Sequence, residues 1–164
     1  MEVRAASVDD AEAVAAVHVL SWQGAYRGLI PDAYLDTLSV RRRHEIWSRI
    51  PAEADLPRTG AFVLQDGLEV IGFTHVAPTR DEGLPASTGE VTALYVAPSA
   101  WGVGGGRRLL DTAKSATPRL SSWGRAGLAA SVSLRRADRP ASGRTRPSRS
   151  DRCPRGPVAE SATG

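Results

Sequence analysis

A glycine-rich bend between a strand-like run and a helix constrains this chain more than any other part of its sequence. Residues 90–96 (EVTALYV) read as a buried strand, which ends before Pro98. Four glycines follow within residues 102–106, and a helical pattern begins at Arg107. Glycine lets a backbone turn sharply and approach a ligand closely, and free N–H groups at a helix start attract anions. The bend therefore predicts an anion site, and a pyrophosphate is the natural guest.

The spacing of the glycines excludes two common phosphate motifs. A dinucleotide fingerprint that starts at Gly102 or Gly104 would need its third glycine at Arg107 or Leu109. The phosphate loop of nucleoside triphosphatases needs a Gly-Lys-Ser/Thr run, and this segment contains no lysine. A flexible turn without a ligand is the alternative, and its position after a buried strand favours the binding interpretation.

The rest of the front part alternates strand and helix signals. Asp66-Gly67 lies between two apolar runs and favours the two-residue turn of a β-hairpin. Ser7, three residues before Asp10, is typical of a helix N-terminus. In order, the patterns predict a strand at 3–5, helices at 7–22, 31–38 and 41–50, strands at 61–65, 68–73 and 90–96, and a helix from Arg107. The expected fold class is α/β (α+β), with a mixed, mostly antiparallel sheet flanked by helices.

The composition changes abruptly near residue 115. Residues 1–114 carry 11 basic and 15 acidic side chains, whereas residues 115–164 carry 10 arginines and 3 acids. Arg, Ser, Ala, Pro and Gly supply 37 of these last 50 residues. Such a segment buries too little apolar surface to offset the entropy of ordering it. We interpret residues 1–114 as a folded domain and residues 115–164 as a disordered or frameshifted tail.

Other features exclude whole classes of protein. No apolar run approaches the ~20 residues that span a bilayer, and Asp9, Asp10 and Glu12 interrupt any signal peptide, which predicts a cytoplasmic protein without a membrane partner. The single Cys153 offers no internal disulfide, and no Cys/His cluster predicts a metal site. The arginine-rich tail could contact nucleic-acid phosphates, but Trp123 is its one aromatic residue, so a nucleic-acid role is the weakest hypothesis.

The stretch from Ala93 to Arg107 resembles the acetyl-coenzyme A loop of the GCN5-related N-acetyltransferases, the GNAT family. The family pattern is Gln/Arg-x-x-Gly-x-Gly/Ala; Gly104 and Gly106 match its last two fixed positions, and Trp101 stands at the first. Residues 21–31 (SWQGAYRGLIP) are similar to the segment between the first two helices in one branch of the family. The resemblance covers about residues 3–114.

This resemblance implies transfer of an acetyl group from acetyl-CoA, as co-substrate and without a metal, to an amine of a small molecule or protein. The pantetheine arm would bond to the strand edge at Leu94, Tyr95 and Val96. The pyrophosphate would be held by the backbone amides of Gly102, Val103, Gly104, Gly105, Gly106 and Arg107.

A base assists such a transfer, because a lysine-like amine has a pKa of ~10.4 in water. Glu90 is the candidate base, since the family often places a glutamate at the start of this strand; a solvated glutamate at a strand end is the alternative. His75 is a weaker candidate. Trp22 and Tyr26 could line the acceptor pocket, and packing of the first helix explains them equally well.

The resemblance stops after Lys114. Family members continue with a strand, a helix that bears Asn and Tyr, and a final strand pair, and that Tyr usually protonates the leaving thiolate. No tyrosine follows Tyr95 in this chain. We therefore expect a sheet that is incomplete at its C-terminal side and has low activity, with an unpaired edge that would favour a homodimer. The alternative function is a non-catalytic CoA-binding remnant.

Overall fold

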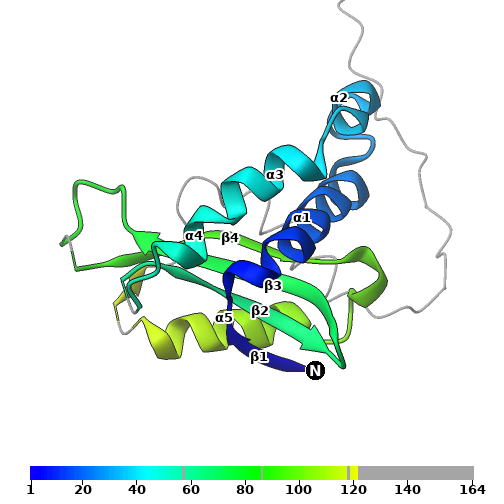
Figure 1. Ribbon diagram of the computed structural model, residues 1–164. Helices are drawn as coiled ribbons and strands as arrows, with labels where there is room; N and C mark the ends of the chain where they lie inside the picture. The colour runs from blue at the N-terminus through cyan, green and yellow to red at the C-terminus, as the bar shows by residue number, and fades with distance from the viewer. Residues whose placement is uncertain (57, 86, 118, 122–164) are drawn as a thin grey trace, which may run out of the picture.

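The computed structural model describes residues 1–56, 58–85, 87–117 and 119–121 of the 164-residue chain. In these residues a β-sheet lies between helices on both of its faces (Figure 1). The elements are β1 (Glu2–Ala5), η1 (Val8–Asp10), α1 (Ala11–Tyr26), α2 (Asp32–Asp36), α3 (Val40–Trp47), α4 (Arg49–Ala52), β2 (Gly60–Asp66), β3 (Glu69–Pro78), β4 (Gly89–Val96), η2 (Pro98–Ala100), α5 (Gly105–Ala116) and β5 (Leu120–Ser121).

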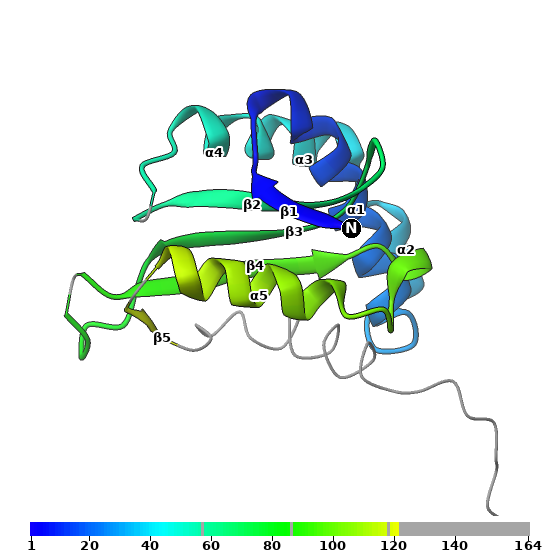
Figure 2. The same cartoon turned by 90° about the horizontal axis from the view of Figure 1, so that it is seen from below.

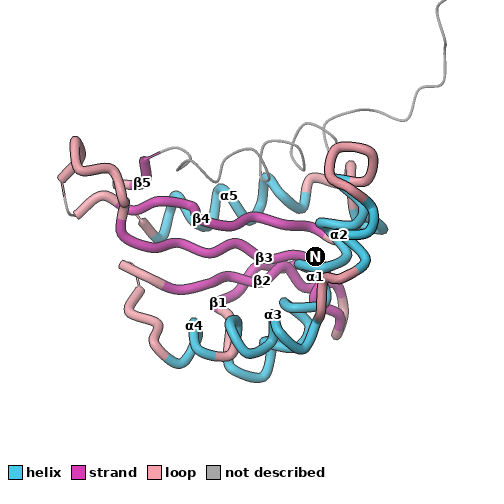
Figure 3. The backbone as a smooth tube through the Cα atoms, turned by 90° about the horizontal axis from the view of Figure 1, so that it is seen from above, coloured by secondary structure: helices cyan, strands magenta, loops and turns pink. Residues whose placement is uncertain are grey.

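The strands follow one another across the sheet in the order β1-β2-β3-β4-β5, as Figure 3 shows. The first three pairings are antiparallel, and the β2–β3 pairing is the hairpin that Asp66-Gly67 predicts, with Gly67 at φ +60°. The short β5 lies parallel to β4 and pairs with it at Gly89 and Glu90. The expected α/β class with a mixed, mostly antiparallel sheet is confirmed.

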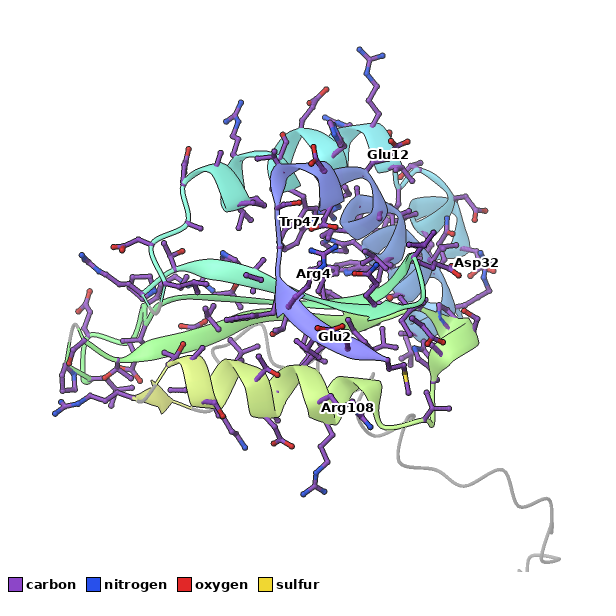
Figure 4. All side chains as sticks on the ribbon, turned by 60° about the horizontal axis from the view of Figure 1, so that its bottom comes forward. Glu2, Arg4, Glu12, Asp32, Trp47 and Arg108 are labelled. Carbon is purple, nitrogen blue, oxygen red and sulfur yellow. The ribbon has the colours of Figure 1, made fainter. Side chains whose placement is uncertain are left out.

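Two apolar cores lie on opposite faces of the sheet. Figure 2 shows the helices that cover these faces, α1 and α3 on one side and α5 on the other. On one face, α1 and α3 pack on Phe73 and Tyr95, and Trp47 of α3 reaches down to the sheet (Figure 4). On the other face, α5 packs through Leu109 against Leu94 and other residues of β2, β3 and β4. Since each face of the sheet is covered, most of its strands alternate between the two cores.

Several helix boundaries differ from the sequence-based expectation. The first helix continues past Trp22 to Tyr26, because Gly24 packs closely against its neighbours and does not end it. The predicted helix over 41–50 is interrupted at Ser48, and Pro51 lies inside α4, where the first turn of a helix tolerates a residue without an N–H. Helix α5 continues past the expected domain boundary at Lys114 to Ala116, and β5 follows. The remainder of the expected tail, residues 122–164, lies outside the described residues.

An ion pair connects the first strand to the first helix. The two terminal guanidinium nitrogens of Arg4 donate to the Asp10 carboxylate at 2.7 Å, and the Ser7 amide donates to the same carboxylate at 2.7 Å. The Arg4 hydrogen bonds lower the pKa of Asp10 to about 2, with further help from Ser7 and against the effect of burial. This pair fixes the start of α1 over the end of β1.

Candidate active site

The N-terminus of α5 presents a run of backbone amides at the glycine bend. Gly104 caps the helix with φ +82°, a left-handed conformation that favours glycine, and its carbonyl accepts from Arg108 at 3.2 Å. Within the part of the chain that the structure describes, no hydrogen bond engages the amides of residues 102–107. A helix start of this kind carries partial positive charge and suits an anion.

Gly104 and Gly105 of the bend are suited to glycine for different physical reasons. A Cβ on Gly105 would lie 2.5 Å from Leu64 Cδ2, so only glycine lets α5 begin this close to β2. A Cβ on Gly104 would meet nothing within 4 Å, so the space beside that residue is open. The first glycine therefore places the helix, and the second leaves room next to the free amides.

Arginines in the first turn of α5 add to the positive charge of the bend. Arg107 and Arg108 are exposed, and Figure 4 labels Arg108 on α5. Among the described residues, Arg107 forms a long ion pair of 3.7 Å with Asp111, between two well-exposed side chains. Cations at a helix N-terminus oppose the macrodipole, and a bound anion would remove this conflict.

Trp101, at the position where the family pattern has Gln or Arg, connects the bend to the end of β4. Its Nε1 donates to the Val96 carbonyl at 2.6 Å, and the buried Ser21 hydroxyl of α1 donates to the same carbonyl at 3.0 Å. A Cβ on Gly24 would lie 2.8 Å from Pro98 Cγ and 3.1 Å from Trp101 Cη2. Helix α1, the end of β4 and the bend therefore meet at one point.

The backbone N–H and C=O groups of β4 point alternately to the two sides of the strand. In an antiparallel pair, successive residues direct their N–H and C=O groups alternately toward and away from the neighbour. The Ala97 amide donates to Ile71 of β3, so Tyr95 also faces β3, whereas Leu94 and Val96 face away from it. Of the three strand residues expected to bind a coenzyme arm, Leu94 and Val96 thus have backbone groups on the correct side. The Val96 carbonyl already has its partners, and the backbone of Tyr95 is used within the sheet.

A β-bulge at Thr92 changes which side chains share a face. His75 is opposite Ala93 and Val76 is opposite Val91, so Thr92 is the extra residue of β4. Before the bulge Val91 packs in the core under α5, and after it Leu94 and Val96 do so. Tyr95 and Ala93 consequently face α1, as does the side chain of Glu90 on the other side of the bulge. Sequence patterning gave no sign of this extra residue.

Glu90 is buried, with 3% of its surface exposed, and both carboxylate oxygens bind Arg80. The Arg80 guanidinium donates to Oε1 at 3.1 Å, and the Arg80 backbone amide donates to Oε2 at 3.2 Å. The Arg80 side chain itself is 71% exposed. The alternative of a solvated strand-end glutamate is therefore wrong, and Arg80, on the loop after β3, is a partner that no sequence signal indicated.

His75, the weaker candidate base, lies across from the bulge on the face that α1 and α3 cover. Its Nδ1 is hydrogen-bonded to the Thr92 hydroxyl, and its ring meets the Trp47 ring edge-on with centroids 5.9 Å apart. Burial lowers the pKa of His75 to about 4. The imidazole is consequently neutral near pH 7.

Aromatic rings surround another histidine, the buried His18, between α1 and the sheet. His18 stacks on Tyr95 at 4.8 Å, and its Nδ1 accepts from Trp47 Nε1 at 3.0 Å. Burial lowers the pKa of His18 to about 3, and the charge of Arg43 acts in the same direction. The buried Nε2 of His18 therefore carries the proton and finds no acceptor in the described part of the chain.

Of the two predicted acceptor-site residues, Trp22 lies beside this histidine and Tyr26 lies beside Trp22. The rings of Trp22 and Tyr26 are 5.0 Å apart, and the Arg43 guanidinium lies 5.8 Å from the centre of the Trp22 ring. Burial raises the pKa of Tyr26 to about 12, with a smaller contribution from Tyr95. The structure thus brings Trp22 and Tyr26 together with Tyr95 on the face that Glu90 shares.

The described residues contain no group of His, Cys, Asp and Glu side chains arranged to hold a metal ion. Across the same residues, no helix combines the length and apolar character needed to cross a bilayer.

Within the described residues, β4 is paired with β5 at Gly89 and Glu90, whereas the backbone groups of Leu94 and Val96 face away from β3 next to the glycine bend, an arrangement suited to a long, anionic coenzyme. The acetyltransferase (GNAT) family model matches residues 22–120, well over half of the 164-residue chain. This chain therefore belongs to the GNAT family, as the resemblance predicts.

One curated relative and two solved structures illustrate the similarity. The uncharacterized N-acetyltransferase YuaI of Bacillus subtilis (strain 168) is 34% identical over 109 residues, which cover 66% of this chain and 59% of the relative. The chain thus spans about three fifths of that relative's length. The PaiA N-acetyltransferase from Thermoplasma acidophilum, in complex with coenzyme A, matches with a TM-score of 0.54 and 22% identity over 70% of this chain and 69% of its own. YncA from Salmonella typhimurium, a putative acetyltransferase with its cofactor acetyl-CoA, matches at 0.55 and 20% over 82% and 75%. At 22% and 20% identity, the two structures show that this chain shares their fold.

Proposed function

We propose that this chain is an acetyl-CoA-dependent N-acetyltransferase that acts on an amine of a small molecule or a protein. The observation that carries the proposal is the row of outward backbone groups: the amides of residues 102–107 in the bend and those of Leu94 and Val96 on β4. Solved structures of similar fold contain coenzyme A or acetyl-CoA, which supports the same ligand here.

The bend is the proposed diphosphate site. Its amides and the positive end of the α5 macrodipole would bind the phosphate oxygens, and Arg107 would add charge. The pantetheine arm would bond to the Leu94 N–H and C=O and to the Val96 N–H, as an added strand does. These N–H groups are also the donors available to polarise the thioester carbonyl as negative charge develops on its oxygen.

The reaction forms a bond between the acceptor nitrogen and the acetyl carbon and breaks the bond from that carbon to sulfur. The acceptor amine must lose a proton, and Glu90 is the proposed acceptor of that proton. Arg80 keeps the buried Glu90 carboxylate oriented and charge-balanced. General base catalysis of this kind contributes roughly 10²–10⁴-fold in rate.

The acceptor site is proposed on the α1 face of β4. Trp22, Tyr26 and Tyr95 supply flat apolar surface there, with polar groups at their edges. The net charge of residues 1–114, which carry 15 acidic against 11 basic side chains, suits a cationic amine. The acceptor is therefore proposed to be a primary amine on a partly apolar carrier.

Calorimetric titration of the full chain with acetyl-CoA tests the binding step. Gly104→Ala would strain a residue at φ +82° and place a methyl group in the open space beside the amides, so affinity should fall at least tenfold. Gly67→Ala is the matched control, because Gly67 also has positive φ, at +60°, with nothing within 4 Å of its Cβ position, and lies in the β2–β3 turn. The control should lose similar stability and keep wild-type affinity. Equal affinities of all three proteins for acetyl-CoA would contradict the proposed diphosphate site.

Binding without catalysis is the second candidate, because no tyrosine follows Tyr95 in the sequence to protonate the leaving thiolate. Thiol release measured with a panel of primary amines separates the two. Release that depends on both acetyl-CoA and amine supports the transferase, and saturable acetyl-CoA binding without any release supports the binding protein.

A further inference from the structure

The proposed base and the proposed reaction centre are far apart along β4. Leu94 lies four positions after Glu90, which corresponds to at most roughly 13 Å of extended strand. Each oxygen of the Glu90 carboxylate also accepts one hydrogen bond from Arg80, at 3.1 and 3.2 Å. A proton that leaves an amine beside Leu94 therefore needs an intermediate group to reach Glu90.

The bulge places such a group midway. Thr92 is the extra residue of β4, and its hydroxyl lies on the same face as Glu90, hydrogen-bonded to His75 Nδ1. Both Thr92 and His75 are half-buried, whereas Thr74, the other threonine of this strand pair, is fully buried. The pair thus lies at the boundary of the core.

We infer that the Thr92 hydroxyl and His75 form a proton relay between the acceptor amine and Glu90, an inference that rests on the proposed function. The amine nitrogen gives its proton to Thr92 Oγ1 while Thr92 gives its own proton to His75 Nδ1. The imidazolium then loses its Nε2 proton toward Glu90 and solvent, and the resulting Nδ1–H ring returns to its starting tautomer by proton exchange before the next turnover. Thr92 touches the substrate, and His75 is a positioning residue that acts through it.

The surroundings of the His75 ring favour loss of a proton from its imidazolium form. Burial lowers the pKa of His75 to about 4, so its imidazolium is a strong acid that gives its proton up quickly. The edge of the Trp47 ring holds the imidazole plane from the α3 side. The charged groups nearest in sequence on this side of the sheet are Glu90 and Arg80, which already form an ion pair with each other.

The test measures steady-state acetyl transfer from acetyl-CoA to a primary amine in the wild type and matched variants. Thr92→Val removes the hydroxyl at nearly constant shape and should lower kcat about 10- to 100-fold, with little change in acetyl-CoA affinity. Thr92→Ser restores the hydroxyl and should recover kcat to within about threefold. His75→Phe keeps a ring against Trp47 and should match Thr92→Val, and the double variant should lose no more than either single variant.

Thr74→Val is the control, because it also removes a threonine hydroxyl bond, from Thr74 Oγ1 to the Ala93 carbonyl at 3.0 Å, on the α5 side of the sheet. It should lower the melting temperature and leave kcat within about threefold. Wild-type kcat in Thr92→Val, or losses that add in the double variant, would overturn the relay and leave the proposed function standing. Absence of turnover in the wild type, despite acetyl-CoA binding, would overturn the proposed transferase and the relay with it.

Discussion

Gly105 sets how closely the N-terminus of α5 approaches the sheet, and Gly105→Ala should destabilise the protein. The added Cβ would lie 2.5 Å from Leu64 Cδ2, more than 1 Å inside normal carbon–carbon contact. Leu64 is fully buried in β2, so it cannot move into solvent. Overpacking of this kind costs about 1–3 kcal/mol, and the better helix propensity of alanine returns up to ~1 kcal/mol. We expect a net loss of about 1–2 kcal/mol in the free energy of unfolding.

A double-mutant cycle with Leu64→Val isolates the clash. Valine lacks the δ carbons, so this change alone should cost about 1 kcal/mol through lost burial. In that background Gly105→Ala should cost less than about 0.5 kcal/mol, because the colliding atom is gone, and the coupling energy should be about 1–1.5 kcal/mol. Urea unfolding followed by tryptophan fluorescence measures all four proteins. Additive losses within ~0.3 kcal/mol would refute the idea that Leu64 contact makes this glycine necessary.

Three further predictions concern the base, the buried histidines and the N-terminal ion pair. Glu90→Gln should lower turnover roughly 10²–10⁴-fold and leave acetyl-CoA affinity within about twofold; equal loss in both kinetic and binding assays would remove Glu90 from the base role. The pKa values of His18 and His75, about 3 and about 4 against an ordinary 6.5, mean that unfolding takes up two protons, so the free energy of unfolding should fall from pH 6.5 toward pH 4 with a slope approaching ~2.7 kcal/mol per pH unit. A flat urea midpoint over that range would contradict the burial of both rings. Asp10→Asn should cost about 1–2 kcal/mol at pH 7, and the difference from wild type should shrink as the pH falls from about 4 to about 2, because the low pKa of Asp10 stabilises the fold only while the carboxylate is ionised. A difference that stays constant across that range would show that charge is not its cause.

Strand β4, the glycine bend and the helix after it could be predicted from sequence, because each has a local signal. Alternating and β-branched residues indicated the strand over 90–96, and clustered glycines before a helical pattern indicated the bend. The hairpin followed from Asp66-Gly67 for the same reason. These signals depend on neighbouring residues in the chain, so a single sequence is enough to predict these elements.

The parts that were missed depend on contacts between distant residues. The bulge at Thr92 arises from how β3 and β4 pair, and no residue type in the strand predicts it. Arg80 binds Glu90 from a loop, and the Trp47 indole reaches His18 across 29 positions of sequence. The pairing with β3 also determines which backbone amides of β4 face outward. The sequence therefore predicted the strand but not which of its residues have outward-facing amides.

The central claim is that backbone amides of the bend bind the diphosphate of coenzyme A. Nuclear magnetic resonance of the ¹⁵N-labelled full chain tests it directly, with coenzyme A and pantetheine added in separate titrations. Coenzyme A should shift the amide resonances of residues 102–107 together with those of Leu94 and Val96. Pantetheine, which lacks the diphosphate, should shift only the β4 amides. Unchanged resonances over 102–107 at saturating coenzyme A would contradict the account.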